Sequence, residues 1–153
     1  MRKLVTISLV FFVISGCAKR LVPGPRGFWK SNRFDRLGNQ IGRWNVYYDS
    51  ARIIPFTKGR YRHGIAVKLW RYYSPLGVLE RKEHYRLKGL SYLTYYYPNG
   101  NVAREGPARM VNELDGLHFY WFGEWQVYFI QGGLEKAETY SEGKLVSTRQ
   151  VAP

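Results

Sequence analysis

Four segments of the chain alternate between apolar or aromatic positions and polar ones, and they resemble one another. Residues 42–48 recur closely as residues 123–129, and further copies occupy residues 68–74 and 91–97. A period of two over such short runs is typical of β-strands with one buried face. A similarity that returns along the chain indicates a repeat protein. One large apolar residue anchors each copy, at Trp44, Trp70, Leu93 and Trp125.

A turn follows each of these segments. Pro75-Leu76-Gly77 and Pro98-Asn99-Gly100 place proline where a fixed negative φ is needed and glycine where φ must be positive, which predicts a type I turn and a bulge. Gln131-Gly132 keeps the glycine, but Ala51 does not, so the first turn is predicted to be looser. The chain is therefore predicted to be all-β, an elongated antiparallel sheet of about four stacked β-hairpins. Glycine marks the second turn of each hairpin, at Gly64, Gly89, Gly116 and Gly143.

The alternation divides the predicted strands into two faces. One face carries the anchors together with Val46, Tyr48, Tyr72, Tyr95, Tyr97, Val127 and Phe129, and it is expected to form the core. The other face carries one tyrosine per hairpin beside two arginines, a set suited to sugars, lipid headgroups or a peptide strand. Alternatively, these tyrosines pack in a second small core or in cross-strand pairs. The candidate binding residues are Tyr47, Tyr73, Tyr96, Tyr128, Arg43 and Arg71.

Four bulky residues in succession interrupt the spacing of the repeats, at Phe119, Tyr120, Trp121 and Phe122. If they are exposed, they form an aromatic hot spot or a wedge at a membrane interface. If they are buried, they belong to an additional strand, and burial is the expectation for such large apolar side chains.

The N-terminus has a basic start, followed by the apolar run Leu4 to Ile14, which is too short to cross a bilayer as a helix. Ile14-Ser15-Gly16-Cys17 resembles the lipobox of bacterial lipoproteins. The resemblance implies that residues 1–16 are a signal peptide and that Cys17 receives the lipid. It also implies a location in the cell envelope, at the outer membrane where one exists, because no aspartate follows Cys17, and otherwise on the outer face of the cytoplasmic membrane. The alternatives are an ordinary cleaved signal or an uncleaved anchor.

Positive charge is concentrated in the first part of the chain, whose net formal charge is +13. Residues 18–100 contain 17 basic and 4 acidic residues, whereas residues 101–153 contain 5 and 7. Residues 17–37 are predicted to be a basic linker rich in proline and glycine. A basic region beside a lipid anchor attracts anionic headgroups or envelope polymers, although it also serves solubility alone.

The residues Tyr140 to Leu145, and the run from Tyr96 to Gly100, resemble the bacterial variant of the MORN repeat. The resemblance covers residues 38–146 and leaves residues 147–153 as a C-terminal tail. It departs from the repeat at Leu93, at Ala51 and between Gly106 and Phe122. It implies a row of hairpins that binds proteins or lipids, and no enzyme.

Residue types that carry chemistry are scarce and scattered. A single cysteine excludes an intramolecular disulfide and a thiolate zinc site, and the three histidines are far apart in the sequence. Glu80 with Glu83, and Glu135 with Glu138, occupy equivalent positions and are expected to be solvated charges that offset neighbouring basic residues. We therefore expect no catalytic residue, no metal and no cofactor beyond the lipid on Cys17.

These features predict a membrane-anchored envelope lipoprotein that acts as a binding scaffold for a protein, an anionic lipid or an envelope polymer. The alternative is a cytoplasmic antitoxin-like or polyanion-binding module. The chain's high pI of about 10 and its interleaved aromatic residues are consistent with binding of nucleic acid, but the signal sequence opposes that partner.

Overall fold

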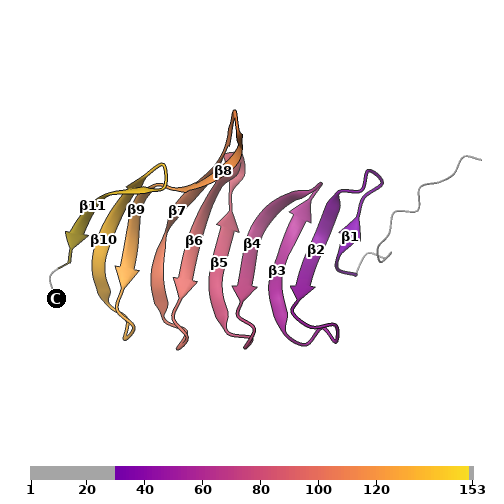
Figure 1. Ribbon diagram of the computed structural model, residues 1–153. Helices are drawn as coiled ribbons and strands as arrows, with labels where there is room; N and C mark the ends of the chain where they lie inside the picture. The colour runs from indigo at the N-terminus through magenta and orange to yellow at the C-terminus, as the bar shows by residue number, and fades with distance from the viewer. Residues whose placement is uncertain (1–29, 152–153) are drawn as a thin grey trace, which may run out of the picture.

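The computed structural model describes residues 30–151. They form one open antiparallel sheet of 11 strands, in which each strand pairs with its neighbours in sequence from β1 to β7, and then β7 pairs with β9, β9 with β10 and β10 with β11 (Figure 1). Strand β8 lies off this path and pairs with β7. The predicted all-β sheet of hairpins is confirmed. The strands are β1 (Arg33–Phe34), β2 (Gln40–Tyr47), β3 (Pro55–Arg62), β4 (Ile65–Tyr73), β5 (Leu79–Tyr85), β6 (Leu90–Tyr96), β7 (Val102–Glu113), β8 (Gly116–Trp121), β9 (Gly123–Tyr128), β10 (Leu134–Ser141) and β11 (Lys144–Gln150).

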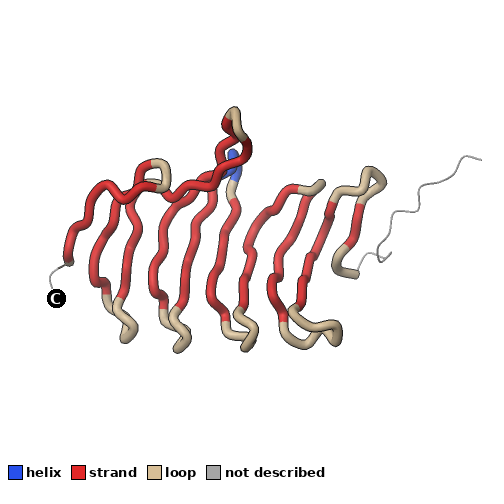
Figure 2. Tube along the Cα trace, in the orientation of Figure 1, coloured by secondary structure: helices blue, strands red, loops and turns tan. Residues whose placement is uncertain are grey.

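The turns lie along the two long edges of the sheet (Figure 2). Between β5 and β6 the turn is a short 3-10 helix, η1 (Leu87–Gly89). Within residues 30–151 the structure contains no helix of the length and hydrophobicity that crossing a membrane requires.

Four hairpins share one turn edge and one irregularity. In three of them the turn has the same two backbone hydrogen bonds, as in the pair Gly77 N to Ser74 O at 2.9 Å and Ser74 N to Val78 O at 2.8 Å. This is the predicted type I turn with a bulge. The first hairpin differs, because its turn extends to Ile54, where the Asp49 carboxylate accepts hydrogen bonds from the Ile53 and Ile54 amides. Each return strand skips one residue in the register, at Phe56, Glu80, Ala103 and Glu135.

Two glycines in the strands make room for two tryptophans. A Cβ on Gly59 would lie 2.0 Å from the Trp70 ring, and a Cβ on Gly106 would lie 2.4 Å from the Trp125 ring. Each indole Nε1 donates to the carbonyl that follows its glycine, at Arg60 O and Pro107 O. In the third hairpin the neighbouring residue on β5 is Glu83, whose side chain occupies this space, so the smaller Leu93 serves as the anchor.

The core lies on one side of the sheet, which we call the tryptophan face. Leu93, Ala108 and Trp125 are fully buried there, and Trp70 is 5% exposed. Trp44 is only half-buried and contacts Phe34 and Tyr61 edge to face. The expected core positions Val46, Tyr48 and Phe129 are exposed, which corrects the prediction. A single sheet with no second layer has nothing to cover the ends of its strands.

The hairpin β7–β8 projects from the row of strands (Figure 1). It pairs in register from Ala108 opposite Trp121 to Glu113 opposite Gly116. Trp121 stacks on Trp125 with the ring centroids 3.9 Å apart, so the base of this hairpin extends the core.

The sheet extends past both ends of the predicted repeat region, 38–146. At the first end, β1 lies within the predicted linker, and the Asn32 side chain hydrogen-bonds to the amide and carbonyl of Asn45 as a further strand would. His63 Nδ1 lies 3.1 Å from an Asp35 carboxylate oxygen, and this hydrogen bond, together with backbone amides, lowers the pKa of Asp35 to about 2. At the other end, β11 continues to Gln150 with every residue exposed.

Candidate functional site

The face opposite the tryptophans, which we call the basic face, carries one continuous row of residues across the sheet. Residues that are paired in an antiparallel register lie on the same side. The pairings therefore bring together residues from strands far apart in the sequence. From β2 to β11 the row consists of Asn45, Lys58, Arg71, Lys82, Thr94, Glu105, Gln126, Ala137 and Arg149.

A shallow depression of about 540 Å³ opens on this face over β2, β3 and β4. The predicted residues Arg43 and Arg71 both line it, and the structure adds three cations that the sequence reasoning missed. None of the lining residues is acidic, and within residues 30–151 none of the five cations forms an ion pair. The full lining is Arg43, Asn45, Lys58, Gly59, Arg60, Lys68, Leu69 and Arg71.

Irregular pairing between β3 and β4 shapes this depression. The register passes from Lys58 opposite Arg71 to Arg60 opposite Val67, so residues 68–70 face a single position on β3. Lys68 adopts a left-handed conformation with φ of 61° in the middle of β4. The bulge redirects the strand around the Trp70 indole, which crosses Gly59. The same packing that fills the tryptophan face therefore adds a cation to the basic face.

The predicted tyrosine row pairs with side chains from the preceding return strand. The Lys58 ammonium lies 5.5 Å from the Tyr73 ring centroid, and the Lys82 ammonium lies 4.8 Å from that of Tyr96. At the next equivalent position Tyr128 donates to Glu105 at 3.0 Å instead. Burial and this carboxylate raise the pKa of Tyr128 to about 12. Tyr47 is half-buried in the first hairpin.

These contacts favour the cross-strand alternative for the tyrosines over a ladder of free rings. Tyr73 and Tyr96 hold two lysines of the row in place. On the basic face, positively charged side chains lie on β2 to β5, and the first acidic residue of the row is Glu105 on β7.

Two glutamates that were expected to be solvated are buried on the tryptophan face. Glu83 is 5% exposed and accepts hydrogen bonds from Tyr72 at 2.8 Å and Tyr85 at 2.6 Å, with Arg81 at 3.1 Å. Burial and this carboxylate raise the pKa of Tyr72 to about 12, and they raise that of Tyr85 as well.

Glu138 repeats this arrangement two hairpins later and is 6% exposed. Lys136 lies 2.9 Å away, and the Tyr140 hydroxyl donates at 2.8 Å. Burial opposes its ionisation, but these hydrogen bonds prevail and lower the pKa of Glu138. The predicted offset of basic residues therefore holds for both glutamates, whereas their predicted exposure is wrong. Counting alternate residues from the turn does not show that both side chains point to the core, because each return strand skips one residue in the register.

The aromatic run at residues 119–122 divides between the two environments that the sequence left open. Trp121 belongs to the core, and Phe122 is half-buried beneath the Arg109 guanidinium, 5.6 Å from its ring centroid. Phe119 is 43% exposed, and Tyr120 is half-buried. Burial was therefore the right expectation for Trp121 and the wrong one for Phe119.

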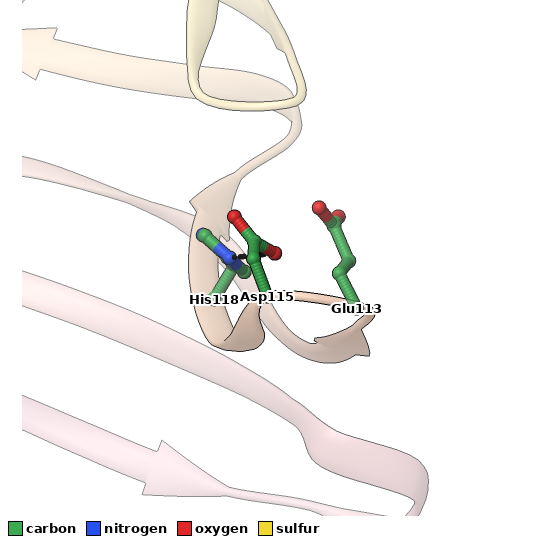
Figure 3. A group of neighbouring side chains, drawn as sticks. All are labelled: Glu113, Asp115 and His118. Carbon is green, nitrogen blue, oxygen red and sulfur yellow. Dashed lines mark hydrogen bonds and ion pairs between the residues drawn. The ribbon is translucent and has the colours of Figure 1, made fainter.

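At the tip of the β7–β8 hairpin, Glu113, Asp115 and His118 place possible ligand atoms within 4.8 Å of one another (Figure 3). Sequence reasoning dismissed the histidines as isolated and missed this group. His118 Nε2 pairs with Asp115 Oδ1 at 2.8 Å, and the two carboxylates are exposed. Two exposed carboxylates and a paired histidine are common on surfaces, so this cluster adds no chemistry to the basic face.

Cys17, the predicted lipidation site, lies outside the described residues. No protein-family model, curated protein or solved structure matches the chain.

Proposed function

We propose that this protein is a lipid-anchored binding scaffold of a bacterial cell envelope, which holds an anionic partner on its basic face and catalyses no reaction. The observation that carries the proposal is the depression formed by Arg43, Lys58, Arg60, Lys68 and Arg71, which contains no acidic residue. Unpaired cations at this density repel one another and cost stability in the free protein. An anionic ligand relieves this repulsion.

The orientation of the two faces supports a scaffold. The buried core lies on the tryptophan face, so the cations on β2 to β5 are not needed to fill it. Four of the five cations are exposed, at Arg43, Arg60, Lys68 and Arg71. Guanidinium groups donate two parallel hydrogen bonds to a carboxylate or phosphate, which favours them over lysine for recognising such groups.

The absence of catalysis is supported by the way the buried carboxylates are used. Glu83 and Glu138 are the buried acidic residues, and each has a cation and at least one tyrosine hydroxyl as partner. Their hydrogen bonds stabilise the sheet, and Glu80, which lines a depression over β3 to β6, is exposed. The resemblance to MORN repeats points in the same direction.

Anchoring is proposed from the lipobox-like residues Ile14 to Cys17. Cell fractionation of the wild type beside Cys17→Ser, with the intact mass of the N-terminal fragment, tests it. The wild type should be acylated and membrane-bound, and the variant should be neither. Two soluble, unprocessed proteins would remove the envelope from the proposal and favour the cytoplasmic polyanion-binding alternative.

Anion binding is tested separately with the full-length protein in neutral detergent. Wild type and Arg43→Gln/Arg71→Gln are titrated at low salt with polyphosphate, alginate and vesicles containing phosphatidylglycerol. The control variant Arg36→Gln/Lys144→Gln removes the same charge from exposed positions outside the row. At least one of the three anions should bind, and only the first variant should weaken binding. If the wild type binds none of them, the proposal fails.

A further inference from the structure

The row of cations on the basic face is linear rather than convergent. Lys58, Arg71 and Lys82 lie on three adjacent strands, and the outer two are separated by about 9.5 Å, twice the spacing of paired strands. A single small anion needs donors that converge on one point. A row of this kind instead matches anionic groups that recur along a chain lying across the strands.

Neutral hydrogen-bonding groups lie at both ends of this row. Asn45 precedes Lys58 on β2, and Thr94, whose hydroxyl donates to Glu105 at 3.4 Å, follows Lys82 on β6. The Asn45 side-chain amide lines the depression and has no hydrogen-bond partner among residues 30–151. An amide and a hydroxyl beside cations suit a ligand that carries hydroxyl groups as well as negative charges.

Two other polyanions fit this surface less well. Single-stranded nucleic acid binds through bases that stack on free aromatic rings, but Lys58 and Lys82 already lie over Tyr73 and Tyr96. A bilayer surface favours exposed apolar side chains beside the cations. One such residue, Ile65, which pairs with Arg62, is exposed on the basic face, but the more exposed Leu76 and Leu114 lie in turns.

From these observations we infer that the ligand of the basic face is a linear acidic polysaccharide that crosses β2 to β6 along the row from Asn45 to Thr94. The inference rests on the proposed function and names the class of its ligand. The arginines and lysines bind the acidic groups, and Asn45 and Thr94 bind hydroxyl groups. Tyr73 and Tyr96 are positioning residues that hold the two lysines in the row.

Calorimetric titration of the full-length protein in neutral detergent tests this inference. The probes are alginate oligomers of increasing length, a polyphosphate of equal charge, neutral dextran and vesicles containing phosphatidylglycerol. Alginate should bind about tenfold more tightly than polyphosphate, the gain from one or two added hydrogen bonds, and dextran should not bind. Affinity should rise with oligomer length up to about 19 Å, the width of the five strands, and then level off.

Three variants assign the effect to residues. Lys58→Gln/Lys82→Gln should weaken alginate binding at least tenfold, and Arg36→Gln/Lys144→Gln, at exposed positions outside the row, should not change it. Asn45→Ala should reduce the preference for alginate and leave polyphosphate affinity unchanged. Circular dichroism of each variant verifies that the sheet is intact.

The remaining outcomes separate this inference from the proposed function. Equal affinity for alginate and polyphosphate would mean that charge alone is recognised, and it would overturn the inference while anion binding stands. Binding to vesicles without binding to either polymer would make the ligand a lipid surface, with the same consequence. If no probe binds, both proposals fail.

Discussion

The contact between Gly106 and Trp125 gives the sharpest test of how the sheet is held together. A Cβ at position 106 would lie 2.4 Å from two atoms of the Trp125 ring, so the indole of Gly106→Ala must move by about 1 Å to reach an ordinary contact. Trp125 is fully buried, stacks on Trp121 and donates to Pro107 O at 3.0 Å, so such a shift disturbs each of these contacts.

Overpacking of this kind costs about 1 to 3 kcal/mol, of which the lower chain entropy of alanine returns about 0.5 to 1 kcal/mol. We therefore expect Gly106→Ala to lower the free energy of unfolding by about 0.5 to 2 kcal/mol. For a domain of this size that corresponds to about 2 to 8 °C in melting temperature. Urea unfolding followed by tryptophan fluorescence measures the change.

A double-mutant cycle assigns the cost to the indole. Leucine already serves as the anchor at position 93, so Trp125→Leu removes the ring but keeps an apolar anchor. In that background Gly106→Ala should cost less than about 0.5 kcal/mol. Gly59→Ala is the matched control, because its clash is with Trp70 and must persist in the Trp125→Leu protein. If Gly106→Ala lowers the free energy of unfolding equally in both backgrounds, the contact between position 106 and the Trp125 ring is not the cause.

Three further predictions follow from the core and its buried charges. Trp125→Ala should cost about 3 to 5 kcal/mol, because the fully buried ring leaves a cavity; an unchanged melting temperature would refute its place in the core. Trp121→Ala should destabilise the sheet strongly, whereas Phe119→Ser, at an exposed position, should change stability by less than about 0.5 kcal/mol in a parallel thermal melt; similar losses for both would place Phe119 in the core. The lowered pKa of Glu138 means that its ionised form stabilises the fold above the unfolded value of about 4.3, and this contribution is lost as the pH falls through the lowered value. Wild type should therefore lose more stability between pH 5 and pH 3 than Glu138→Gln, and parallel pH profiles would contradict the pairing with Lys136 and Tyr140.

The architecture was predictable because its signals are local. The tryptophan anchors, the period of two and the Pro-x-Gly turns each specify a hairpin within about ten residues of sequence, and stacking the hairpins follows from their shared apolar face. The position of Arg43 and Arg71 on the same face was also predictable from alternation in β2 and β4. The exposure of Val46 and Phe129 was not, because alternation gives the direction of a side chain but not what covers it.

The remaining features depend on register, which local patterns do not reveal. Lys58 and Arg60 join the depression because β3 pairs with both β2 and β4, and Lys68 joins it through a bulge. Glu83 and Glu138 face the core because each return strand skips one residue after its turn, which shifts the parity that the sequence suggests. The register places Gly59, Glu83, Gly106 and Glu138 at equivalent positions on successive return strands, and Leu93 is the anchor that follows Glu83 instead of a glycine.

The salt dependence of anion binding tests the central claim most directly. Each cation that contacts a polyanion releases counterions, so the slope of log affinity against log salt concentration reports the number of contacts. For the full-length protein and an anionic polymer that it binds, the slope for Arg43→Gln/Arg71→Gln should be shallower than that for wild type by about two contacts. The slope for Arg36→Gln/Lys144→Gln should equal that of wild type. Equal slopes for all three proteins would show that the basic face does not hold the ligand.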